Sequence, residues 1–285
     1  DIWFEEAIKY IEIQKDNPFF CYISTNAPHG PFYVDNKYSE PYKGIKNVPS
    51  NEFYGMITNV DDNIGILTKK LEALGIADNT ILIFMTDNGS SMGDKKIKVF
   101  NAGMRGKKNS EYDGGHRVPF FIKYPNGKLE AGKDINNISA HIDVLPTLIA
   151  LCELKLNEPI NFDGKNLMPL INGSSKDWSE RLLITDSQRV EHPIKWRKSA
   201  VMSDNWRLVN GKELYNMVDD PSQTNDVALE EPKKVKKFRK TYEEWWNDVS
   251  IDFEKYPAIG IGSPKENPVN LTSHDWHSDT QVPWN

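Results

Sequence analysis

A carboxylate and an amide in the sequence FMTDNG are the first side chains that could carry chemistry. Asp87 and Asn88 come directly after an apolar run of the kind that forms a buried strand. Both offer oxygen ligands, which suit a hard cation such as Ca²⁺ or Mg²⁺ better than zinc. Asp-Asn-Gly is also a favoured turn sequence, so this tripeptide alone leaves a simple strand-ending turn as an alternative.

A basic motif follows in GMRGKKNSEYDGGHRVPF, where four Lys and Arg residues stand on both sides of a Gly-Gly pair. A loop of this composition can bring cationic side chains and backbone N–H groups onto a tetrahedral oxyanion without steric interference. The motif alone leaves a solvated surface loop with ordinary lysines as the alternative.

The third candidate is His29, which stands between two prolines in STNAPHGPF. Prolines restrict the backbone and hold the imidazole in one direction, which is useful for an acid or an oxyanion donor. A lone loop histidine can equally be incidental. The argument for a site therefore depends on the combination of the three motifs.

Hydrophobic periodicity predicts the elements that must position these motifs. Apolar residues recur at helical spacing over 51–74, and Gly75 stands where that helix would stop. The short apolar runs at 19–25, at 80–86 and from Val118 predict strands, with 80–86 buried on both faces. Strands that alternate with helices predict an α/β fold with a mainly parallel sheet. Ligands bind outside the carboxyl ends of such strands, where the polar motifs lie.

The pattern changes near Ser175, where we place a domain boundary. Closely spaced apolar runs separated by polar turns predict a small antiparallel sheet: RLLIT, KSAVMS, NWRLVN and KELYNM. The basic amphipathic stretch 230–249 predicts a helix laid on that sheet. The expected organisation is an α/β catalytic part over 1–175, a small α+β subdomain over 176–253 and an extended tail over 254–285.

A polar, cation-rich stretch separates the first two strands of the predicted small sheet. From this position a loop can reach the strand ends of the large domain, so we expect it to line the substrate entrance. Its members are Gln188, Arg189, Glu191, His192, Lys195 and Arg197. We expect His192 and Arg197 to contact substrate, and a solvated surface loop is the alternative.

Composition bounds the class of protein. A chain of 285 residues with 38% hydrophobic and 27% charged residues can build a real core. The formal net charge of -6 argues against a nucleic-acid partner, which would need a clustered basic surface. No apolar stretch reaches the roughly 18 residues of a membrane span, and the first residues do not resemble a signal peptide. Cys21 and Cys152 lie far apart in apolar runs, so we expect two buried thiols.

Four other polar residues are expected to be structural. Asp61 and Asp62 would point about 100° apart on a helix, so they cannot converge on one ion. His141 and Asp143 open an apolar helix, whose positive N-terminal end favours an acidic side chain.

Taken in order along the chain, the three motifs resemble those of the type I sulfatases in the alkaline-phosphatase-like superfamily. The ordered set is much more specific than any single member. The similarity extends over nearly the whole chain, to about residue 249, through NVDDNIGILTKKLEALG, HIDVLPTLIAL, DGKNLMPLI and ELYNMVDDP. It implies an alkaline-phosphatase-like fold, hydrolysis of sulfate esters, and a packing role for His116 in the Gly-Gly-His-Arg-Val-Pro run.

The resemblance also implies roles for individual residues. Asp87 and Asn88 would ligate the active-site cation, usually calcium, with magnesium as the alternative. Lys108 resembles the lysine that contacts the substrate sulfate, and His29 resembles the histidine beside the sulfate and the ester oxygen. Lys107 would replace Lys108 if the register were shifted by one residue.

Sulfatases of this family begin with a strand that ends in paired aspartates, followed by a Cys or Ser in a CxPSR-like motif that is oxidised to formylglycine. Neither feature is in this sequence, and neither Cys21 nor Cys152 precedes Pro-Ser-Arg. We therefore expect a fragment that is inactive alone and whose partner is the missing N-terminal segment of the same enzyme. The resemblance further implies a sulfated small molecule or glycan as substrate and a periplasmic or secreted location.

Two other functions remain open at this stage. Phosphomonoester and phosphonate hydrolases of the same superfamily often place His where this chain has Asn88, so TDNG favours the sulfatase without deciding the question. The second alternative is a non-catalytic sulfatase-like protein that binds anionic glycans.

Overall fold

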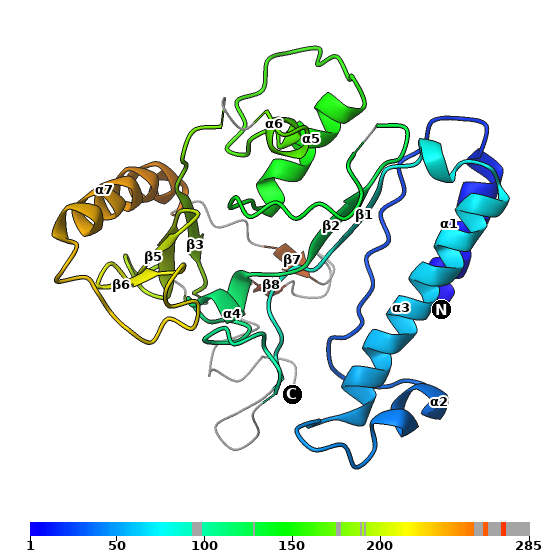
Figure 1. Cartoon of the computed structure of the whole chain (residues 1–285), viewed down its shortest axis with the longest axis horizontal. Coiled ribbons are helices and arrows are strands. Elements are labelled where there is room, and N and C mark those ends of the chain that lie inside the picture. The colour runs from blue at the N-terminus through cyan, green and yellow to red at the C-terminus, as the bar shows by residue number, and fades with distance from the viewer. Residues whose placement is uncertain are drawn as a thin grey trace.

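Helices and three separate sheets make up the described part of the chain, which Figure 1 shows with α1 and α3 at one end and α7 at the other. This computed structural model describes residues 1–92, 99–127, 129–174, 178–188, 190 and 192–253, together with the backbone of two short strands. These strands are β7 (Ile259–Ile261) and β8 (Val269–Leu271), which pair antiparallel. The predicted tail over 254–285 otherwise lies outside the described residues, as does Ser175 at the predicted boundary.

The helix predicted before Gly75 is α3 (Asn51–Ala73). It begins at Ser50, whose hydroxyl accepts a hydrogen bond from the backbone amide of Phe53 at 3.1 Å. It ends because Gly75 adopts a left-handed conformation with φ of +70°, which a residue without Cβ tolerates best. The stop predicted at this glycine is confirmed.

A buried apolar cluster joins α3 to α1 (Ile2–Gln14). Its buried members are Phe4, Ile11, Leu67 and Leu71. Burying each such side chain contributes roughly 1.5–3 kcal/mol, which outweighs the modest propensity of either helix alone. Short elements complete this side of the molecule: α2 (Asn36–Ser39), η1 (Glu40–Tyr42) and η2 (Ala77–Asn79).

Two strands, β1 (Leu82–Met85) and β2 (Phe120–Lys123), form a two-stranded sheet in the first half of the chain. They pair antiparallel, with Leu82 opposite Lys123, so this pair differs from the parallel arrangement that we predicted. Parallel neighbours need a crossover, usually helical, whereas the described part of this connection holds only the short α4 (Asp113–His116). β1 is half-buried rather than buried on both faces.

The predicted strand at 19–25 is extended but makes no strand pairing with any described residue. Phe19 and Ile23 pack on the cluster between α1 and α3, as does Leu82 of β1. The alternate side chains Phe20 and Tyr22 are 76% and 74% exposed. Alternating burial is the pattern of a strand with one covered face. The run predicted as a strand is therefore extended and strand-like, with one covered face and one exposed face.

The expectation of two buried thiols was also wrong. Cys21, in the extended run, is half-buried, and burial raises the pKa of its thiol. Cys152 is exposed because it follows the last residue of α5 (Val144–Leu151), where the helix ends at the surface.

A buried ion pair fixes the start of α5. Asp143, in η3 (His141–Asp143), receives two hydrogen bonds from the guanidinium of Arg181, at 2.9 and 2.7 Å. The same carboxylate accepts from the backbone amides of Ala140 and Lys165, at 2.7 and 2.8 Å. Removing one partner of such a pair costs about 3–5 kcal/mol, because the other charge stays buried. Nearby, α6 (Met168–Ile171) packs against Phe120.

The C-terminal sheet is antiparallel with strand order β3-β4-β5-β6, which confirms the predicted small sheet. Its strands are β3 (Leu183–Asp186), β4 (Ser199–Met202), β5 (Trp206–Val209) and β6 (Glu213–Asn216). The helix α7 (Pro232–Val249) covers one face through Phe238 and Tyr242, as the amphipathic pattern predicted. The short η5 (Ser250–Asp252) follows it.

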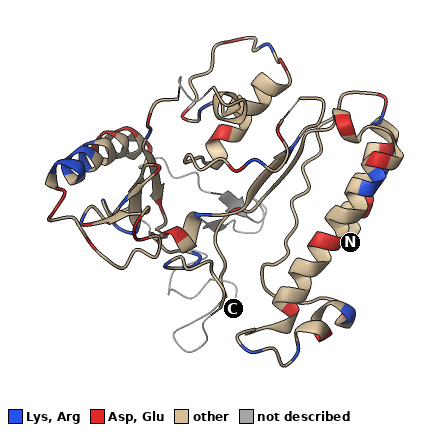
Figure 2. Ribbon diagram, in the orientation of Figure 1, with Lys and Arg blue, Asp and Glu red and all other residues tan. Residues whose placement is uncertain are grey.

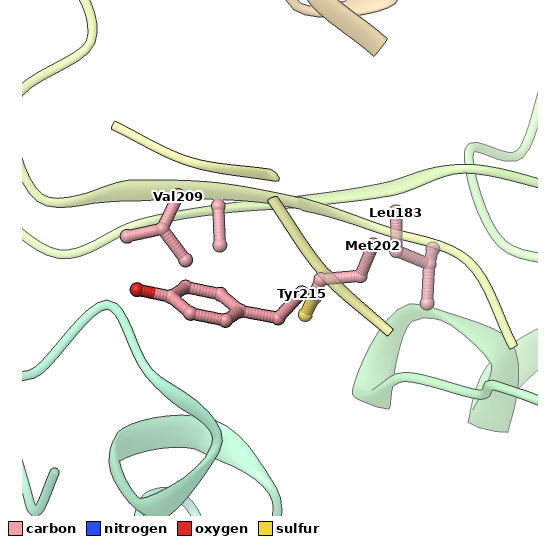
Figure 3. Close-up of a cluster of buried hydrophobic side chains, with 5 residues drawn as sticks. Leu183, Met202, Val209 and Tyr215 are labelled. Carbon is pink, nitrogen blue, oxygen red and sulfur yellow. The ribbon is translucent and has the colours of Figure 1, made fainter. Parts of the chain in front are cut away.

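The other face of this sheet carries a second buried cluster (Figure 3), made of Leu183, Ala200, Met202, Val209 and Tyr215. Tyr112 and Ile138, from the first half of the chain, pack against it. The C-terminal sheet is thus buried on both faces, and one of those faces is closed by the loop that contains the basic motif.

Charged residues are distributed along the described chain, and Lys and Arg gather at one end of α7 (Figure 2). Among the described residues, no helix is long and apolar enough to cross a membrane.

Candidate functional site

The end of β1 presents the Asp-Asn pair. Thr86 follows the last strand residue and leads directly into Asp87, which is exposed, and Asn88, which is half-buried. The imidazole Nε2 of His141 donates a hydrogen bond to the backbone carbonyl of Thr86 at 2.7 Å. A side chain from η3, which directly precedes α5, thus supports the backbone immediately before the proposed metal ligands.

A backbone junction joins the Asp-Asn turn to the basic loop. The amide of Gly89 donates to the carbonyl of Gly115, and the amide of Lys108 donates to the carbonyl of Ser90, both at 2.9 Å. A Cβ added to Gly89 would lie 2.0 Å from the carbonyl oxygen of Gly114, so only glycine permits this contact. The Gly-Gly pair is therefore a close-packing element that brings the two motifs together.

The two lysines of the basic loop differ in their surroundings. Lys108 is half-buried, and its ammonium makes no hydrogen bond or ion pair with any residue that the structure describes. Lys107 is exposed. A partly desolvated ammonium without a counter-ion is suited to bind an anion.

The sequence allowed the arginines of this motif to bind an oxyanion. In the structure they make other contacts. Arg105 donates to the hydroxyl of Tyr215 at 3.0 Å, on the C-terminal sheet. Arg117 is largely exposed and lies 3.9 Å from the buried carboxylate of Asp113. Both guanidinium groups therefore serve contacts within the protein.

His116 packs within the same loop. Its Nε2 donates to the backbone carbonyl of Glu111 at 3.3 Å. Burial lowers the pKa of His116, and the nearby negative charge of Asp113 opposes that shift. Burial and this contact suit the packing role that the family resemblance implied.

His29 is exposed, with one ring nitrogen already engaged. Its Nδ1 donates to the carbonyl of Gly30 at 2.8 Å, since a carbonyl oxygen can only accept. Nε2 is therefore the nitrogen that remains for a ligand. In Figure 1 the extended segment before His29 runs between β1 and α3. Within the part of the chain described, no hydrogen bond joins His29 to Asp87 or Lys108.

The second half of the predicted entrance loop is clamped to α7. Lys195 forms an ion pair with Glu243, and Trp196 Nε1 donates to the same carboxylate at 2.8 Å. The Trp196 ring stacks on Tyr242 with centroids 3.7 Å apart. Burial raises the pKa of Tyr242 to about 12 and also raises the pKa of Asp186, which accepts its hydroxyl at 3.2 Å.

The end of this loop approaches the basic motif. Lys198 Nζ lies 3.5 Å from the backbone carbonyl of Asn109, the residue after Lys108, and donates to it. His192 is exposed and Arg197 is half-buried, with its Nη1 buried and unpaired among the described residues. The loop members Arg189 and Glu191 lie outside the described residues.

Family comparison adds a decisive observation to this geometry. Residues 1–154, more than half of the chain, match the family model described as Sulfatase. Residues 106–255 match a second model, described as N-sulphoglucosamine sulphohydrolase, C-terminal. The chain belongs to the sulfatase family.

Named sulfatases are similar to this chain over much of its length. A Formosa agariphila protein named Ulvan-active sulfatase is 30% identical over 198 residues, covering 63% of this chain and 37% of the relative. An N-acetylgalactosamine-6-O-sulfatase of Bacteroides thetaiotaomicron is 26% identical over 280 residues, covering 85% of this chain and 50% of the relative. This sulfatase chain therefore spans half or less of the length of these two relatives.

A solved structure supports the same fold. The crystal structure of Ps i-CgsB in complex with k-i-k-neocarrahexaose matches with a TM-score of 0.73 and 27% identity, covering 86% of this chain and 54% of that one. The α/β class with a smaller antiparallel C-terminal sheet and its helix is thereby confirmed, although the described pair β1-β2 is antiparallel.

The donor chemistry of the Asp-Asn turn fits a hard cation. Asp87 and Asn88 offer one carboxylate and one amide oxygen at adjacent positions, and neither side chain is fully buried. Calcium takes roughly six to eight oxygen ligands, so these two residues make a partial site. Among the described residues, no group of three or more His, Cys, Asp or Glu side chains could hold a metal by itself.

Sequence reasoning missed two contacts at this site. His141 was expected to be structural at a helix start, and its ring reaches the backbone before Asp87. Lys198 was not singled out, and it reaches the turn that holds Lys108. Neither contact has a local sequence signal, because each joins residues that are 55 or more positions apart.

Proposed function

We propose that this chain is the metal-binding and sulfate-binding part of an enzyme that hydrolyses sulfate esters. The backbone junction of Gly89, Gly115 and Lys108 carries the proposal. It holds two oxygen ligands and an ammonium with no counter-ion among the described residues on adjacent turns, which is the chemistry needed to bind a sulfate group beside a cation. The family supports sulfate as the anion.

Lys108 and His29 have different roles toward the substrate: Lys108 binds the sulfate group and His29 protonates the leaving oxygen. The half-buried ammonium of Lys108 neutralises negative charge on the sulfate oxygens. Hydrolysis breaks the bond between sulfur and the ester oxygen, and that oxygen needs a proton as it leaves. Protonated His29 gives this proton from Nε2, because its Nδ1 is held by Gly30.

Asp87 and Asn88 would hold a divalent cation, calcium in the first instance and magnesium as the alternative. When bound, this ion supplies charge stabilisation for the reacting group. Because two residues cannot complete its coordination, we infer that further ligands come from a segment outside these 285 residues. The same segment would supply the nucleophile, a formylglycine, since neither Cys21 nor Cys152 precedes Pro-Ser-Arg.

We infer a sulfated saccharide as the substrate, with an aryl sulfate as a simpler alternative. The names of similar proteins support this class: one relative is named an N-acetylgalactosamine-6-O-sulfatase, and one matching structure holds an oligosaccharide. His192 and Arg197 would contact the saccharide from the entrance loop. A periplasmic or secreted location suits such a substrate.

The test is turnover by the full-length enzyme on sulfated oligosaccharides, 4-nitrophenyl sulfate and 4-nitrophenyl phosphate. We expect sulfate release, and we expect Lys108→Ala to lower kcat/KM by about 10²-fold or more, as loss of a charge-stabilising group does. Lys107→Ala is the matched control, one residue away and exposed, and should have little effect.

Two results would contradict the proposal. Phosphate ester turnover that exceeded sulfate turnover would favour the phosphomonoester or phosphonate hydrolase alternative. Binding of a sulfated glycan without any release of sulfate would identify a non-catalytic glycan-binding protein.

A further inference from the structure

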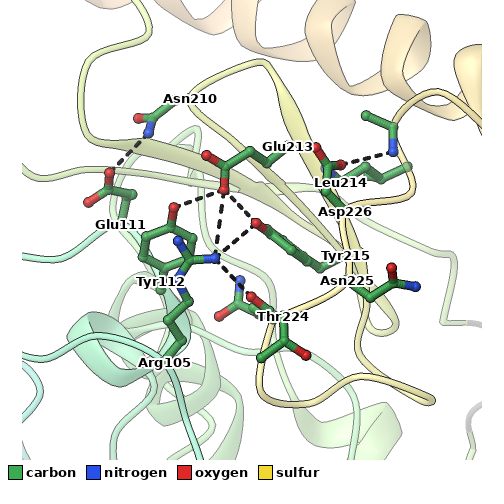
Figure 4. Close-up of polar contacts among 12 residues, drawn as sticks. Arg105, Glu111, Tyr112, Asn210, Glu213, Leu214, Tyr215, Thr224, Asn225 and Asp226 are labelled. Carbon is green, nitrogen blue, oxygen red and sulfur yellow. Dashed lines mark hydrogen bonds and ion pairs between the residues drawn. The ribbon is translucent and has the colours of Figure 1, made fainter.

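Arg105 stands three residues before Lys108 and points to the C-terminal sheet (Figure 4). Its Nη1 donates to the hydroxyl of Tyr215 at 3.0 Å and to the backbone carbonyl of Gln223 at 2.8 Å. The guanidinium carbon lies 3.7 Å from the centre of the Tyr112 ring. One side chain thus combines two directed hydrogen bonds with a stacked cation–π contact.

Glu213 completes the network that receives this arginine. Its carboxylate accepts from the hydroxyls of Tyr112 and Tyr215, at 2.8 and 2.5 Å. It also lies 3.9 Å from Nη1 of Arg105. Both tyrosine hydroxyls have an acceptor and the carboxylate faces a cation, so each member is held in one orientation.

The same loop is attached to the C-terminal sheet on the other side of Lys108. The buried carboxylate of Asp113 accepts a hydrogen bond from Arg207 Nε at 2.8 Å. The backbone amide of Asp113 donates to Gln223 Oε1 at 2.9 Å. The amide of Gly114 donates to the carbonyl of Arg105 at 2.8 Å, which closes the base of the loop. Lys108 therefore lies within a closed loop whose two ends are bound to that sheet.

We propose that Arg105 is a positioning residue for Lys108, and that through it the C-terminal sheet sets the place of the sulfate-binding ammonium. This inference rests on the proposed function of Lys108. A positioning role explains why Arg105, which is close in sequence to the anion-binding Lys108, donates its hydrogen bonds to a tyrosine and a backbone carbonyl over 100 residues away. The C-terminal sheet is then part of the catalytic apparatus without touching substrate.

The first experiment measures turnover by the full-length enzyme with the variants Arg105→Gln, Lys108→Ala and the double variant. A misplaced catalytic group can cost on the order of 10²-fold in rate, so we expect Arg105→Gln to lower kcat by about 10- to 100-fold. In the Lys108→Ala background the same change should cost nothing more. Equal losses in both backgrounds would overturn the proposal.

A matched control separates positioning from general stability. Arg239 also supports the C-terminal part, since it donates to the carbonyl of Gly211 at 2.7 Å and lies over Trp196. Arg239→Gln should lower the unfolding midpoint by an amount similar to Arg105→Gln and leave kcat within about two-fold. A loss of kcat as large as that of Arg105→Gln would contradict the positioning role.

The second experiment needs no turnover. Hydrogen–deuterium exchange of the full-length protein reports on the amide of Lys108, which is bonded to Ser90. We expect Arg105→Gln to speed exchange in the peptide that contains Lys108, and Arg105→Lys to restore part of the protection. If exchange there is unchanged, the proposal is wrong even where turnover falls. If the enzyme releases no sulfate, only the proposed function is wrong. Exchange at the Lys108 amide still tests whether Arg105 positions this loop.

Discussion

The backbone amide of Gly89 donates a hydrogen bond to the carbonyl oxygen of Gly115, at 2.9 Å. This bond joins the turn after β1 to the Gly-Gly pair of the basic loop. Because the two backbones touch, an error in either turn displaces the other. The proposed metal ligands and Lys108 therefore form one mechanical unit.

We predict that Gly89→Ala disrupts this unit. Its Cβ would lie 2.0 Å from the carbonyl oxygen of Gly114, and overpacking of this kind costs typically about 1–3 kcal/mol. Urea unfolding should show the loss of stability, together with weaker cation binding. Gly65→Ala in α3 is the control, because its Cβ meets open space and should stabilise the helix by about 0.5–1 kcal/mol. Equal behaviour of the two variants would count against the junction.

We predict that Asp87→Ala in the full-length enzyme abolishes turnover and weakens divalent-cation binding. Asn88→Ala should be milder, because it removes a neutral ligand where the first change removes a charged one. Titration calorimetry with calcium measures both. Asp61→Ala, at an exposed acid within α3, is the control and should leave calcium affinity unchanged. Unchanged affinity in Asp87→Ala would remove the metal assignment.

Local patterns predicted the parts of the fold that local forces determine. The periodic run before Gly75 became α3, and the four short runs after residue 180 became the antiparallel sheet. The direction of β1 relative to β2 was not predictable in the same way. It depends on the path of the connection between them, which contains no crossover helix in its described part.

The sequence predicted which residue types make up the candidate site, but it did not predict the contacts between them. In the structure the turns of Asp87 and Lys108 are adjacent, because glycines at both turns allow the backbones to meet. Residue type cannot show which partner a charge will choose. Arg105 carries the charge expected of an anion ligand, and its direction depends on Tyr215, 110 residues later.

The lowered pKa of His116 predicts a loss of stability in mild acid. Burial holds the pKa of the folded state below its usual value near 6.5, whereas the unfolded chain has that usual value. As the pH falls through about 6.5, the unfolded state binds the proton first. The contribution of this group to the free energy of unfolding is therefore full above that pH and declines below it.

Urea unfolding between pH 7.5 and 5 should show this decline, and His116→Gln should reduce it. His192→Gln removes an exposed histidine instead and serves as the control. The prediction is wrong if the two variants have the same pH dependence.

We predict that His192→Ala with Arg197→Ala lowers kcat/KM for a sulfated saccharide by about 10-fold or more and leaves 4-nitrophenyl sulfate nearly unchanged. The expectation rests on the loop that Lys198 holds against the turn of Lys108. Lys195→Ala is the contrasting variant, because that side chain is paired with Glu243 on α7 and should act on stability. Equal kcat/KM values for the saccharide in the double variant and the parent would exclude an entrance role.

A protein made of these 285 residues alone is predicted to have no measurable sulfatase activity, and added calcium should not restore it. Covalent catalysis needs a nucleophile that can attack sulfur. Cys21 and Cys152 are not followed by Pro-Ser-Arg, so maturation to formylglycine would not act on either. Lys108 and His29 would at most hold a sulfate ion.

The same protein should self-associate, and its association can be measured beside its activity. The extended segment 19–25 has no strand partner among the described residues, and large apolar side chains in it and on β2 are exposed: Phe20, Tyr22 and Phe121, at 76%, 74% and 65%. Unpaired strand edges and apolar patches promote association. Intact mass, light scattering and an aryl sulfate assay on one preparation decide the matter. Turnover from a sample containing only these residues would overturn the assignment of the nucleophile to another segment. A second peptide carrying a formylglycine would show instead that the active sample was a nicked enzyme.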